Sequence, residues 1–244
     1  MGEDRPLVGR AAVVTGASAG IGRAIALALA ARGANVVLAA RRADRLREVA
    51  AEIEKSSPGV RALPVVADVS REEDVVRLAE AAGRELGAVD VLVSNAGRGY
   101  FARSEAIDAA KLEDLMRVNF LGAVLCVKHM VPGMVARRSG AVVLINSVSG
   151  KRGWAGAAPY VASKFALRGF AQCLWHEVHA HNVRVISVYP DYVSSEFYAA
   201  AGLKAAGLEK AIPPEDVAEL VCGALRLQES TTVVELDVWP TSME

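Results

Sequence analysis

TGASAGIG, residues 15–22, is the most informative stretch of this chain. It lies between a short apolar run at 11–15 and the alanine-rich helical pattern IGRAIALALAARG, which begins at Ile21. Glycine destabilises both strands and helices, so Gly16, Gly20 and Gly22 indicate a turn that needs their backbone freedom. A strand–glycine turn–helix arrangement presents bare backbone N–H groups at a helix N-terminus, where a pyrophosphate can approach closely. The stretch therefore predicts a nucleotide-binding turn.

The glycine spacing is G-x-x-x-G-x-G. It differs from the G-x-G-x-x-G of the common dinucleotide-binding turn, and no Lys-Ser/Thr pair follows as in a phosphate-binding P-loop. A glycine-rich turn without any ligand is the alternative interpretation. The rest of the chain decides between the two.

Short apolar runs alternate with helical patterns along the whole chain. Most of these runs are rich in Val, Ile and Leu without alternation, which is typical of strands buried on both faces. The predicted strands are 11–15, 35–40, 62–67, 90–94, 141–146, 183–189 and 233–239. Strands that alternate with helices, with no linker or repeat between them, predict an α/β fold. We expect a single domain over residues 1–244, with one doubly wound, seven-stranded parallel sheet and helices on both faces.

Composition and charge limit the kinds of partner that we expect for this protein. The chain is 52% hydrophobic, which supports a sizeable core, and its 28 basic residues balance 28 acidic ones. Because the chain has no net charge to attract nucleic acid or a membrane surface, we expect neither as a partner. The start MGEDRPLVGR lacks the apolar core of a signal peptide. Cys126, Cys173 and Cys222 lack CxxC spacing, so we expect reduced thiols packed in the core of a cytoplasmic protein.

Three later stretches carry chemistry at the ends of predicted strands. Asn95-Ala96-Gly97 ends the fourth strand, Ser147 follows the fifth, and YVASK places Tyr160 and Lys164 one helical turn apart. Ligands bind at this edge of an open α/β sheet. An ammonium beside a phenol favours the phenolate and so lowers its pKa, and a serine can donate a hydrogen bond to a carbonyl oxygen. These residues predict acid–base chemistry on a carbonyl or an alcohol.

With these motifs in order and spacing, the chain resembles a short-chain dehydrogenase/reductase of the shorter form. TGxxxGIG, NAG, the serine and YxxxK all occur, and Asn119 in RVNFLG falls at the place of the family's fourth catalytic residue. The resemblance covers essentially the whole chain and implies a Rossmann-type domain. It also implies hydride transfer between nicotinamide and a secondary alcohol or ketone, or a hydroxy acid or oxo acid.

The same resemblance implies a role for each catalytic residue. Tyr160 would protonate the substrate oxygen in reduction and deprotonate it in oxidation, while Ser147 polarises the carbonyl. Lys164 would lower the pKa of the tyrosine and hold the nicotinamide ribose. Asn119 would position a water that links Lys164 to solvent.

The cofactor preference depends on the end of the second strand. Where related NAD enzymes carry Asp, this chain has Ala40 followed by Arg41 and Arg42. Basic residues there accommodate the 2′-phosphate, so we expect NADP(H) to be preferred, with NAD(H) possible. Asp44 is interpreted as a helix-start residue, and Asp68 either contacts the adenine or caps the next helix. The cofactor-binding residues expected are Gly16, Ser18, Gly20, Ile21, Gly22, Arg41, Arg42, Asp68, Val69, Asn95, Ala96, Gly97, Tyr160, Lys164, Pro190, Val193 and Ser195.

The main departure from the family follows the sixth strand. Relatives often read Pro-Gly, whereas this chain has Pro190-Asp191. Aspartate tolerates a left-handed backbone, so the turn itself can survive. Its carboxylate either faces the nicotinamide, where it would favour NADP⁺, or points to solvent. We expect residues 191–212 to form a lid over a mostly apolar carbonyl substrate, which would contact Ser149, Trp154, Tyr192 and Phe197.

Two charged stretches receive structural interpretations. Lys151-Arg152 is expected to be a solvated turn rather than a carboxylate site. His176 and His179 are expected at a polar helix end, with no metal, because no HExxH pattern or further ligand accompanies them.

Other functions share parts of these motifs. A nucleotide sensor without turnover would need only the glycines, and a sugar-nucleotide epimerase could share the Tyr-Lys pair. The intact tetrad argues against the sensor, and the short chain lacks room for a separate sugar-binding domain. The resemblance also implies a homodimer or homotetramer.

Overall fold

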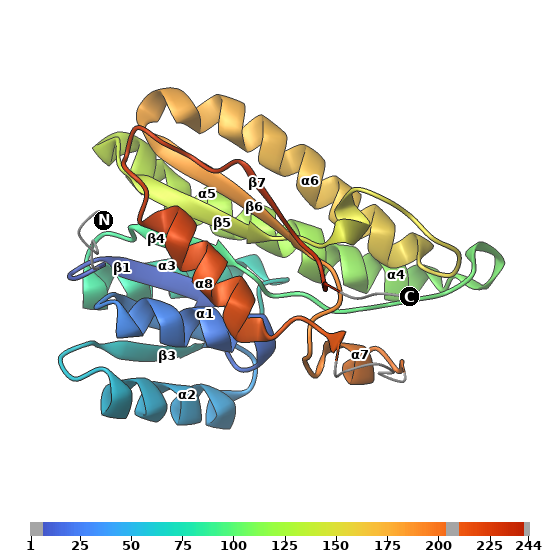
Figure 1. Ribbon diagram of the computed structural model, residues 1–244, viewed down its shortest axis with the longest axis horizontal. Helices are drawn as coiled ribbons and strands as arrows, with labels where there is room; N and C mark the ends of the chain where they lie inside the picture. Colours follow the sequence, from blue (N-terminus) through green and yellow to red (C-terminus); the bar gives the residue numbers. More distant parts are fainter. Residues whose placement is uncertain (1–6, 204–209, 242–244) are drawn as a thin grey trace.

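The computed structural model describes residues 7–203 and 210–241. One seven-stranded parallel sheet has the order β3-β2-β1-β4-β5-β6-β7, which confirms the predicted fold class (Figure 1). The strands are β1 Ala11–Thr15, β2 Asn35–Ala40, β3 Ala62–Val66, β4 Val91–Ser94, β5 Gly140–Ile145, β6 Val183–Pro190 and β7 Glu235–Val238.

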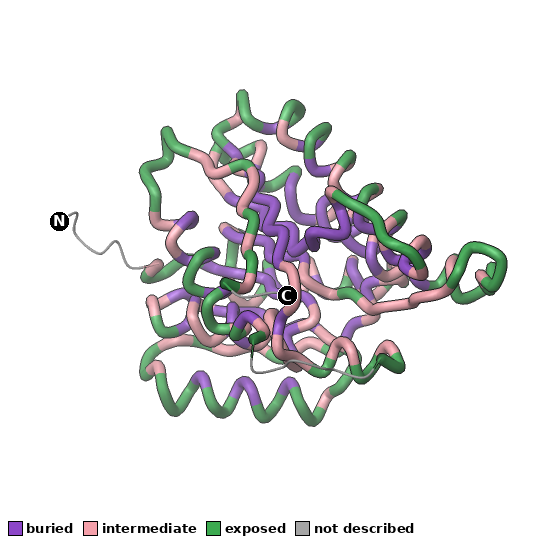
Figure 2. Tube along the Cα trace, turned by 45° about the vertical axis from the view of Figure 1, so that its right-hand side comes forward, coloured by how far each residue is buried: buried purple, intermediate pink, exposed green. Residues whose placement is uncertain are grey.

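Two apolar cores cover the two faces of the sheet. One contains buried residues of α1 Gly20–Ala31, α2 Ala43–Ser56 and α8 Pro214–Leu225. The other contains residues of α3 Glu72–Leu86, α5 Gly122–Arg137 and α6 Ala158–Val178. Figure 2 shows the buried residues along the strands and the inward sides of the helices. Strands covered on both faces carry continuous apolar runs, which is why β1, β2 and β5 are recognisable in the sequence.

The longest helical stretch runs from 109 to 137. It consists of α4 Ala109–Met116, a π-helical turn at Arg117–Leu121, and α5. Its composition and length would suffice to cross a membrane, with a mean hydropathy of 1.5, but half of that window is buried inside the protein. Because α5 supplies many side chains to the second core, the stretch has the contacts of a core helix.

The cysteines differ from the expectation in one respect. Cys126 and Cys222 are buried, as predicted, whereas Cys173 is exposed. Cys173 lies on α6 next to Leu174, whose side chain takes the buried position. The prediction that all three pack in the core is therefore wrong for Cys173.

The strand order reverses between β1 and β4. The chain runs outward from β1 to β2 and β3, then returns to form β4 on the other side of β1. The loops that leave the carboxyl ends of β1 and β4 diverge, and ligands of open α/β sheets bind in the crevice between them. The turn at 15–22 and Asn95-Ala96-Gly97 meet at this point, where Asn95 and Ala96 donate hydrogen bonds to Thr15.

Candidate active site

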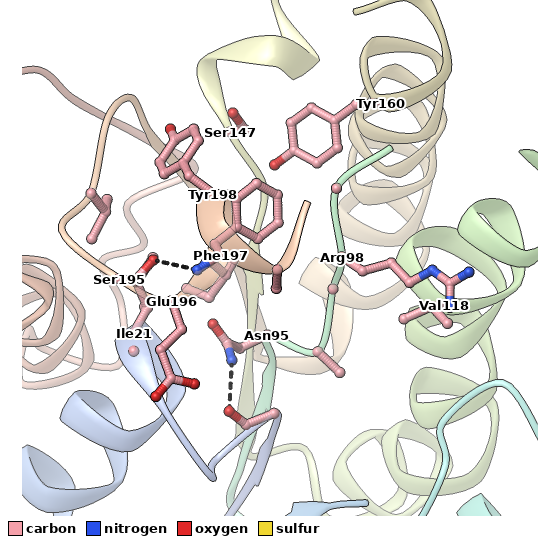
Figure 3. A pocket seen from close by; sticks show the side chains of 18 of the residues that line it. Ile21, Asn95, Arg98, Val118, Ser147, Tyr160, Ser195, Glu196, Phe197 and Tyr198 are labelled. Atoms are coloured by element: carbon pink, nitrogen blue, oxygen red, sulfur yellow. Dashed lines mark hydrogen bonds between the residues drawn. The ribbon is translucent and has the colours of Figure 1, made fainter. Parts of the chain in front are cut away.

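A cavity of about 700 Å³ opens at the carboxyl edge of the sheet. It runs from the glycine turn after β1 to the aromatic side chains of α7 Phe197–Ala200 (Figure 3). All of the expected cofactor residues line it except Gly22. The structure thus brings together in one cavity residues that are far apart in the sequence.

The glycine turn requires its glycines. Gly16 has a φ of +67°, and a Cβ there would lie 2.7 Å from the amide nitrogen of Asn95. A Cβ on Gly20 would come within 3.2 Å of Ser195. Gly22 lies behind the turn, where a Cβ would collide with the carbonyl oxygen of Gly16. Gly16 and Gly20 therefore expose backbone to the cavity, and Gly22 lets the turn close.

Asn95 joins the ends of β1 and β4. Its amide donates to the carbonyl oxygen of Thr15 at 3.0 Å, and its backbone N–H donates to the Thr15 hydroxyl, also at 3.0 Å. The N–H of Ala96 donates to the same hydroxyl. These bonds explain why Asn and Thr occur at these two strand ends: together they hold the mouth of the crevice in place.

Three of the predicted catalytic side chains meet at the wall of the cavity. Tyr160 and Lys164 lie on α6, and Ser147 lies just beyond β5. The ammonium of Lys164 is buried and donates a hydrogen bond to the carbonyl oxygen of Ile145 at 3.0 Å. The hydroxyl of Ser147 is 3.2 Å from that of Ser149 and accepts a hydrogen bond from the Ser149 N–H.

Burial has the largest effect on the pKa values of Tyr160 and Lys164. It raises the pKa of Tyr160 to about 12, and a hydrogen bond with Ser147 opposes the rise. It lowers the pKa of Lys164 to about 8. In the protein alone, loss of hydration dominates the pKa of Tyr160, and the ammonium lies 5.8 Å from the ring centroid. The expectation that Lys164 lowers the pKa of Tyr160 during catalysis stays a prediction. Tyr160 holds its proton at neutral pH.

Asn119 occupies the π-helical turn between α4 and α5. Its side-chain oxygen accepts from the N–H of Arg98 at 2.8 Å, and its amide donates to the Arg98 carbonyl and to the hydroxyl of Ser163. Both amide hydrogens are thereby used, and Asn119 does not line the cavity. Its side chain joins the π-helical turn to α6 and to the loop after β4. Its expected role in positioning a water next to Lys164 stays a prediction. A π-helical turn often marks a functional site.

The two arginines after β2 differ in their surroundings. Arg42 donates to the hydroxyl of Ser18 at 3.0 Å and pairs with Glu196 at 3.1 Å. Arg41 is more exposed and lies 3.9 Å from Asp68. The role of Glu196 is not apparent from the sequence, because its contact with Arg42 spans 154 positions.

The two neighbouring acids are also placed. Asp44 lies in the first turn of α2, as predicted. Asp68 accepts from the N–H and the hydroxyl of Ser70, which closes a turn before α3, and it also lines the cavity. Its expected contact with adenine stays a prediction.

Aromatic side chains form the far end of the cavity. Ser149, Trp154 and Phe197 line it, as expected of substrate-contacting residues. Phe101 and Tyr198 line it as well. The ring of Phe197 lies 5.5 Å from that of Tyr160, and Phe101 lies 5.3 Å from Tyr160 on another side. Figure 3 shows Phe197 and Tyr198 near the hydroxyls of Ser147 and Tyr160.

Tyr192 is set back from the cavity. Its ring packs on that of Tyr198 at 4.5 Å, and its hydroxyl is buried. Tyr198 lines the cavity and Tyr192 does not, so the structure does not support the expected direct contact of Tyr192 with the substrate.

Asp191 lines the cavity with a side chain that is only 13% exposed, 3.7 Å from the guanidinium of Arg152. The solvent-pointing alternative is therefore wrong. Nor does Asp191 have a left-handed backbone: among the described residues, the only non-glycine positions with positive φ are Arg138 and Asn182. Aspartate fits here without the conformational tolerance invoked for it.

Lys151 and Arg152 are not merely solvated. Lys151 pairs with Glu235 and Asp237 of β7 at 2.7 Å, and Arg152 lies over the ring of Trp239 at 4.2 Å. The turn after Ser147 is thus joined to the last strand. The expectation of a solvated turn is wrong here.

The histidines form a polar helix end, as predicted. His176 and His179 are exposed near the end of α6, and the ring of His179 stacks on Trp175 at 4.5 Å.

The lid segment is held at its two ends. Val193 pairs with Ile212 in an isolated parallel bridge, and hydrogen bonds join Ser194 to Ile212 and Ile212 to Tyr192. Between these ends, α7 extends over the cavity, and Leu203 also lines it. Residues 204–209 of the expected lid lie outside the described residues.

Comparison with known proteins identifies the family. The sequence pattern of the short chain dehydrogenases matches residues 10–205. An uncharacterized oxidoreductase of Listeria monocytogenes is 31% identical over 94% of this chain and 96% of its own length. The structure of an alcohol dehydrogenase from Thermococcus sibiricus, complexed with 5-hydroxy-NADP, matches with a TM-score of 0.89 and 31% identity over 96% of this chain and 98% of that one. A metagenomic short-chain oxidoreductase in complex with NADP matches with a TM-score of 0.85 and 34% identity, covering 97% and 99% of the two chains.

Two similar proteins are much longer than this chain. A glycine betaine reductase of Emericella nidulans is 37% identical over 96% of this chain, which spans only 19% of that protein. A 3-ketodihydrosphingosine reductase of Bos taurus is 38% identical over 75% of this chain and 56% of its own length. The extent of the family match and the shared fold lead to one conclusion: the chain belongs to the short-chain dehydrogenase/reductase family of oxidoreductases.

Proposed function

We propose that this protein is an NADP(H)-dependent oxidoreductase that interconverts a ketone and a secondary alcohol, or an oxo acid and a hydroxy acid. The observation that carries the proposal is the continuity of the cavity. Its one end has bare glycine backbone and Arg42, and its other end has Tyr160, Lys164 and Ser147 beneath aromatic side chains. A dinucleotide and a small carbonyl compound fit this order of groups.

The residues fit a dinucleotide phosphate. Gly16 and Gly20 leave backbone accessible at the start of α1, where the helix dipole favours a pyrophosphate. Arg42 is positioned by Ser18 at the end of β2, where a guanidinium can bind the 2′-phosphate. The structures with NADP and 5-hydroxy-NADP support this cofactor. When bound, the nicotinamide cofactor supplies or accepts the hydride.

The chain's own residues handle the proton. In carbonyl reduction, the hydroxyl of Tyr160 gives its proton to the substrate oxygen, and the Ser147 hydroxyl donates a hydrogen bond to that oxygen. The buried Lys164 ammonium stabilises the phenolate that forms, and its remaining hydrogens can bind ribose hydroxyls. In alcohol oxidation the proton travels in the opposite direction. The aromatic wall limits the access of water.

We further propose that one domain carries both sites, with 191–212 as the lid, and that the protein is a cytoplasmic homodimer or homotetramer. Buried free thiols at Cys126 and Cys222 and balanced charge support the location. Two of the relatives are named after compounds that carry a cationic nitrogen: glycine betaine and 3-ketodihydrosphingosine.

Tyr160→Phe tests the proposal. Removing the transferable proton should lower turnover by about 10²–10⁴-fold, the usual contribution of a general acid, and leave NADPH affinity nearly unchanged. Tyr100→Phe is the matched control, since the Tyr100 hydroxyl accepts a hydrogen bond from the N–H of Asp108 and Tyr100 is not among the described residues that line the cavity. NADPH absorbance with a panel of ketones and alcohols measures turnover, and calorimetry measures affinity.

The same assay separates the alternatives. A nucleotide sensor would bind NADPH and turn over none of the panel, and an epimerase would interconvert sugar nucleotides without net NADPH consumption. Near-normal turnover in Tyr160→Phe would refute the proton-transfer role.

A further inference from the structure

The carboxylate of Asp191 lines the cavity and lies 3.7 Å from one cation, the guanidinium of Arg152. Its Oδ2 atom is buried and accepts no hydrogen bond from the described residues. Burial raises the pKa of this carboxyl group, and the charge of Arg152 opposes the rise. A buried carboxylate without a hydrogen-bond donor is costly, so a cation that enters the cavity beside it would be stabilised by its charge.

Arg152 does not supply a hydrogen bond to this carboxylate. Its guanidinium is 3.7 Å from Asp191, beyond hydrogen-bonding distance, and its side chain is half exposed. The guanidinium lies over the ring of Trp239 at 4.2 Å, and Arg152 is not among the residues that line the cavity. The buried ammonium of Lys164 also lines the cavity, but it belongs to the proton-transfer group.

Aromatic rings accompany the carboxylate. Tyr192, the next residue, packs on Tyr198, and Tyr198 meets Phe197 at 5.4 Å. Burial is the main cause of the raised pKa of Tyr198, and the charges of Tyr160 and Asp191 raise it further. The carboxylate of Asp191 is therefore close enough to Tyr198 for an electrostatic effect. The faces of such rings carry partial negative charge and attract cations, most strongly where water is excluded. Carboxylate and rings form one wall of the substrate end.

We propose that this end of the cavity binds carbonyl or alcohol substrates that carry an alkylammonium group. Asp191 and the rings of Phe197 and Tyr198 hold the cationic nitrogen, while the carbonyl oxygen meets Tyr160 and Ser147. The inference rests on the proposed function and specifies its substrate class. It disfavours the oxo acids and hydroxy acids, because their carboxylate would face that of Asp191.

A matched pair of aldehydes tests the proposal. Betaine aldehyde and tert-butylacetaldehyde have nearly the same shape and differ in a charged nitrogen or a neutral carbon. The wild-type kcat/KM should favour the cation by about tenfold or more, the scale of one partly desolvated cation–π contact or charge pair. Asp191→Asn, which keeps the shape and removes the charge, should reduce this ratio about tenfold through the KM of the cation. Equal kcat/KM values for the two aldehydes in the wild type would overturn the proposal.

Asp237→Asn is the control. Asp237 carries the same charge on β7 and pairs with Lys151 outside the cavity, so its replacement should preserve the ratio. A loss as large as that in Asp191→Asn would show that the junction between the turn and β7 sets the preference, which overturns the assignment to Asp191.

Direct binding separates this proposal from the proposed function. Choline and tert-butylethanol are titrated calorimetrically into the enzyme with NADP⁺. If neither these aldehydes nor any ketone or alcohol of the panel is turned over but choline binds about tenfold tighter, the cation site stands and the proposed function fails. If both aldehydes are reduced with equal kcat/KM, the cation site fails alone. If Asp191→Asn changes the NADP⁺/NADPH affinity ratio and not the preference between aldehydes, the carboxylate serves the nicotinamide ring, and the proposal is overturned.

Discussion

Arg42 and Arg41 are neighbours with different surroundings. Arg42 is held by Ser18, whereas Arg41 is two-thirds exposed beside Asp68. A guanidinium that is already positioned loses less entropy when it binds a phosphate, so Arg42 rather than Arg41 is expected to contribute most. The sequence indicates both arginines, and only the contact with Ser18 separates them.

Arg42→Ala should weaken NADPH binding by about 1.5–3 kcal/mol, the range of a charge-assisted hydrogen bond, and change NADH binding little. Arg41→Ala should cost less. Arg45→Ala, which removes a guanidinium paired with Glu48 on the helix surface, is the control. Calorimetric titration with both cofactors measures the losses. Equal losses for NADPH and NADH would mean that Arg42 supports the fold of the turn instead.

The pH dependence of carbonyl reduction follows from Lys164. Burial lowers the pKa of Lys164 to about 8, and the pKa of Tyr160 is raised to about 12. Below pH 8 the lysine is charged and stabilises the phenolate that forms; above it the charge is lost, although Tyr160 is still protonated. The rate of reduction should therefore be level at neutral pH and fall above pH 8. Because arginine stays charged, the residual activity of Lys164→Arg should lack this fall. The same fall in that variant would assign it to another group.

At the scale of elements, the π-helical turn is the feature that the sequence does not predict. It places Asn119 against the backbone of Arg98, a contact that spans 21 positions. Helical periodicity reports only local spacing, so it indicates one helix from α4 into α5 and not the bulge within it. The resemblance identifies Asn119, but its bonding partners come from tertiary packing.

Asn119→Ala should lower the free energy of unfolding by about 1–3 kcal/mol, because it leaves the partly buried N–H and C=O groups of Arg98 without these partners. Urea denaturation measures the loss. Asn35→Ala, which removes a single exposed acceptor of the Arg61 N–H, is the control and should cost less. If stability is unchanged while turnover falls, Asn119 acts on the chemistry directly rather than by positioning.

Glu196 connects the lid to the cofactor end. Its carboxylate lies 3.1 Å from Arg42 and competes with a 2′-phosphate for the same guanidinium. Glu196→Gln should therefore tighten NADPH binding, by no more than about 1 kcal/mol for a pair this exposed, and leave NADH binding unchanged. Glu219→Gln, which breaks the exposed pair with Arg32, is the control. Weaker NADPH binding in Glu196→Gln would show that the carboxylate orients Arg42 rather than competing for it.

At the scale of the whole molecule, the sheet and its cores were predictable from the sequence. The double covering of the sheet turns its inner strands into apolar runs, so most strands were located to within a residue or two. The edge strand β7 was predicted at 233–239 and spans Glu235–Val238, because edge positions are less buried and their apolar pattern is weaker. The surroundings of Asp191 were not predictable, since the neighbours of a side chain beyond a strand end depend on distant segments such as α7 and Trp239.

The expected assembly also belongs to this scale. Phe165 is a large apolar side chain on α6 that is 44% exposed, as suits a contact between copies. Light scattering after size-exclusion chromatography should give two or four times the chain mass of 25.7 kDa, and Phe165→Glu should shift it to a smaller species. Leu227→Glu, at an exposed site away from α6, is the control. An unchanged mass in Phe165→Glu would place the contact elsewhere.

The bridge between Val193 and Ile212 makes the roof of the cavity an exchangeable part. This bridge closes the base of the lid next to the sheet, so the length of the lid can vary without disturbing the register of the sheet. Loop-closure entropy grows slowly, and a doubling of the loop length costs only about 0.6 kcal/mol. A different lid, and with it a different substrate, can therefore be accommodated at little cost in stability. The glycine turn and the proton-transfer group are unchanged by such an exchange.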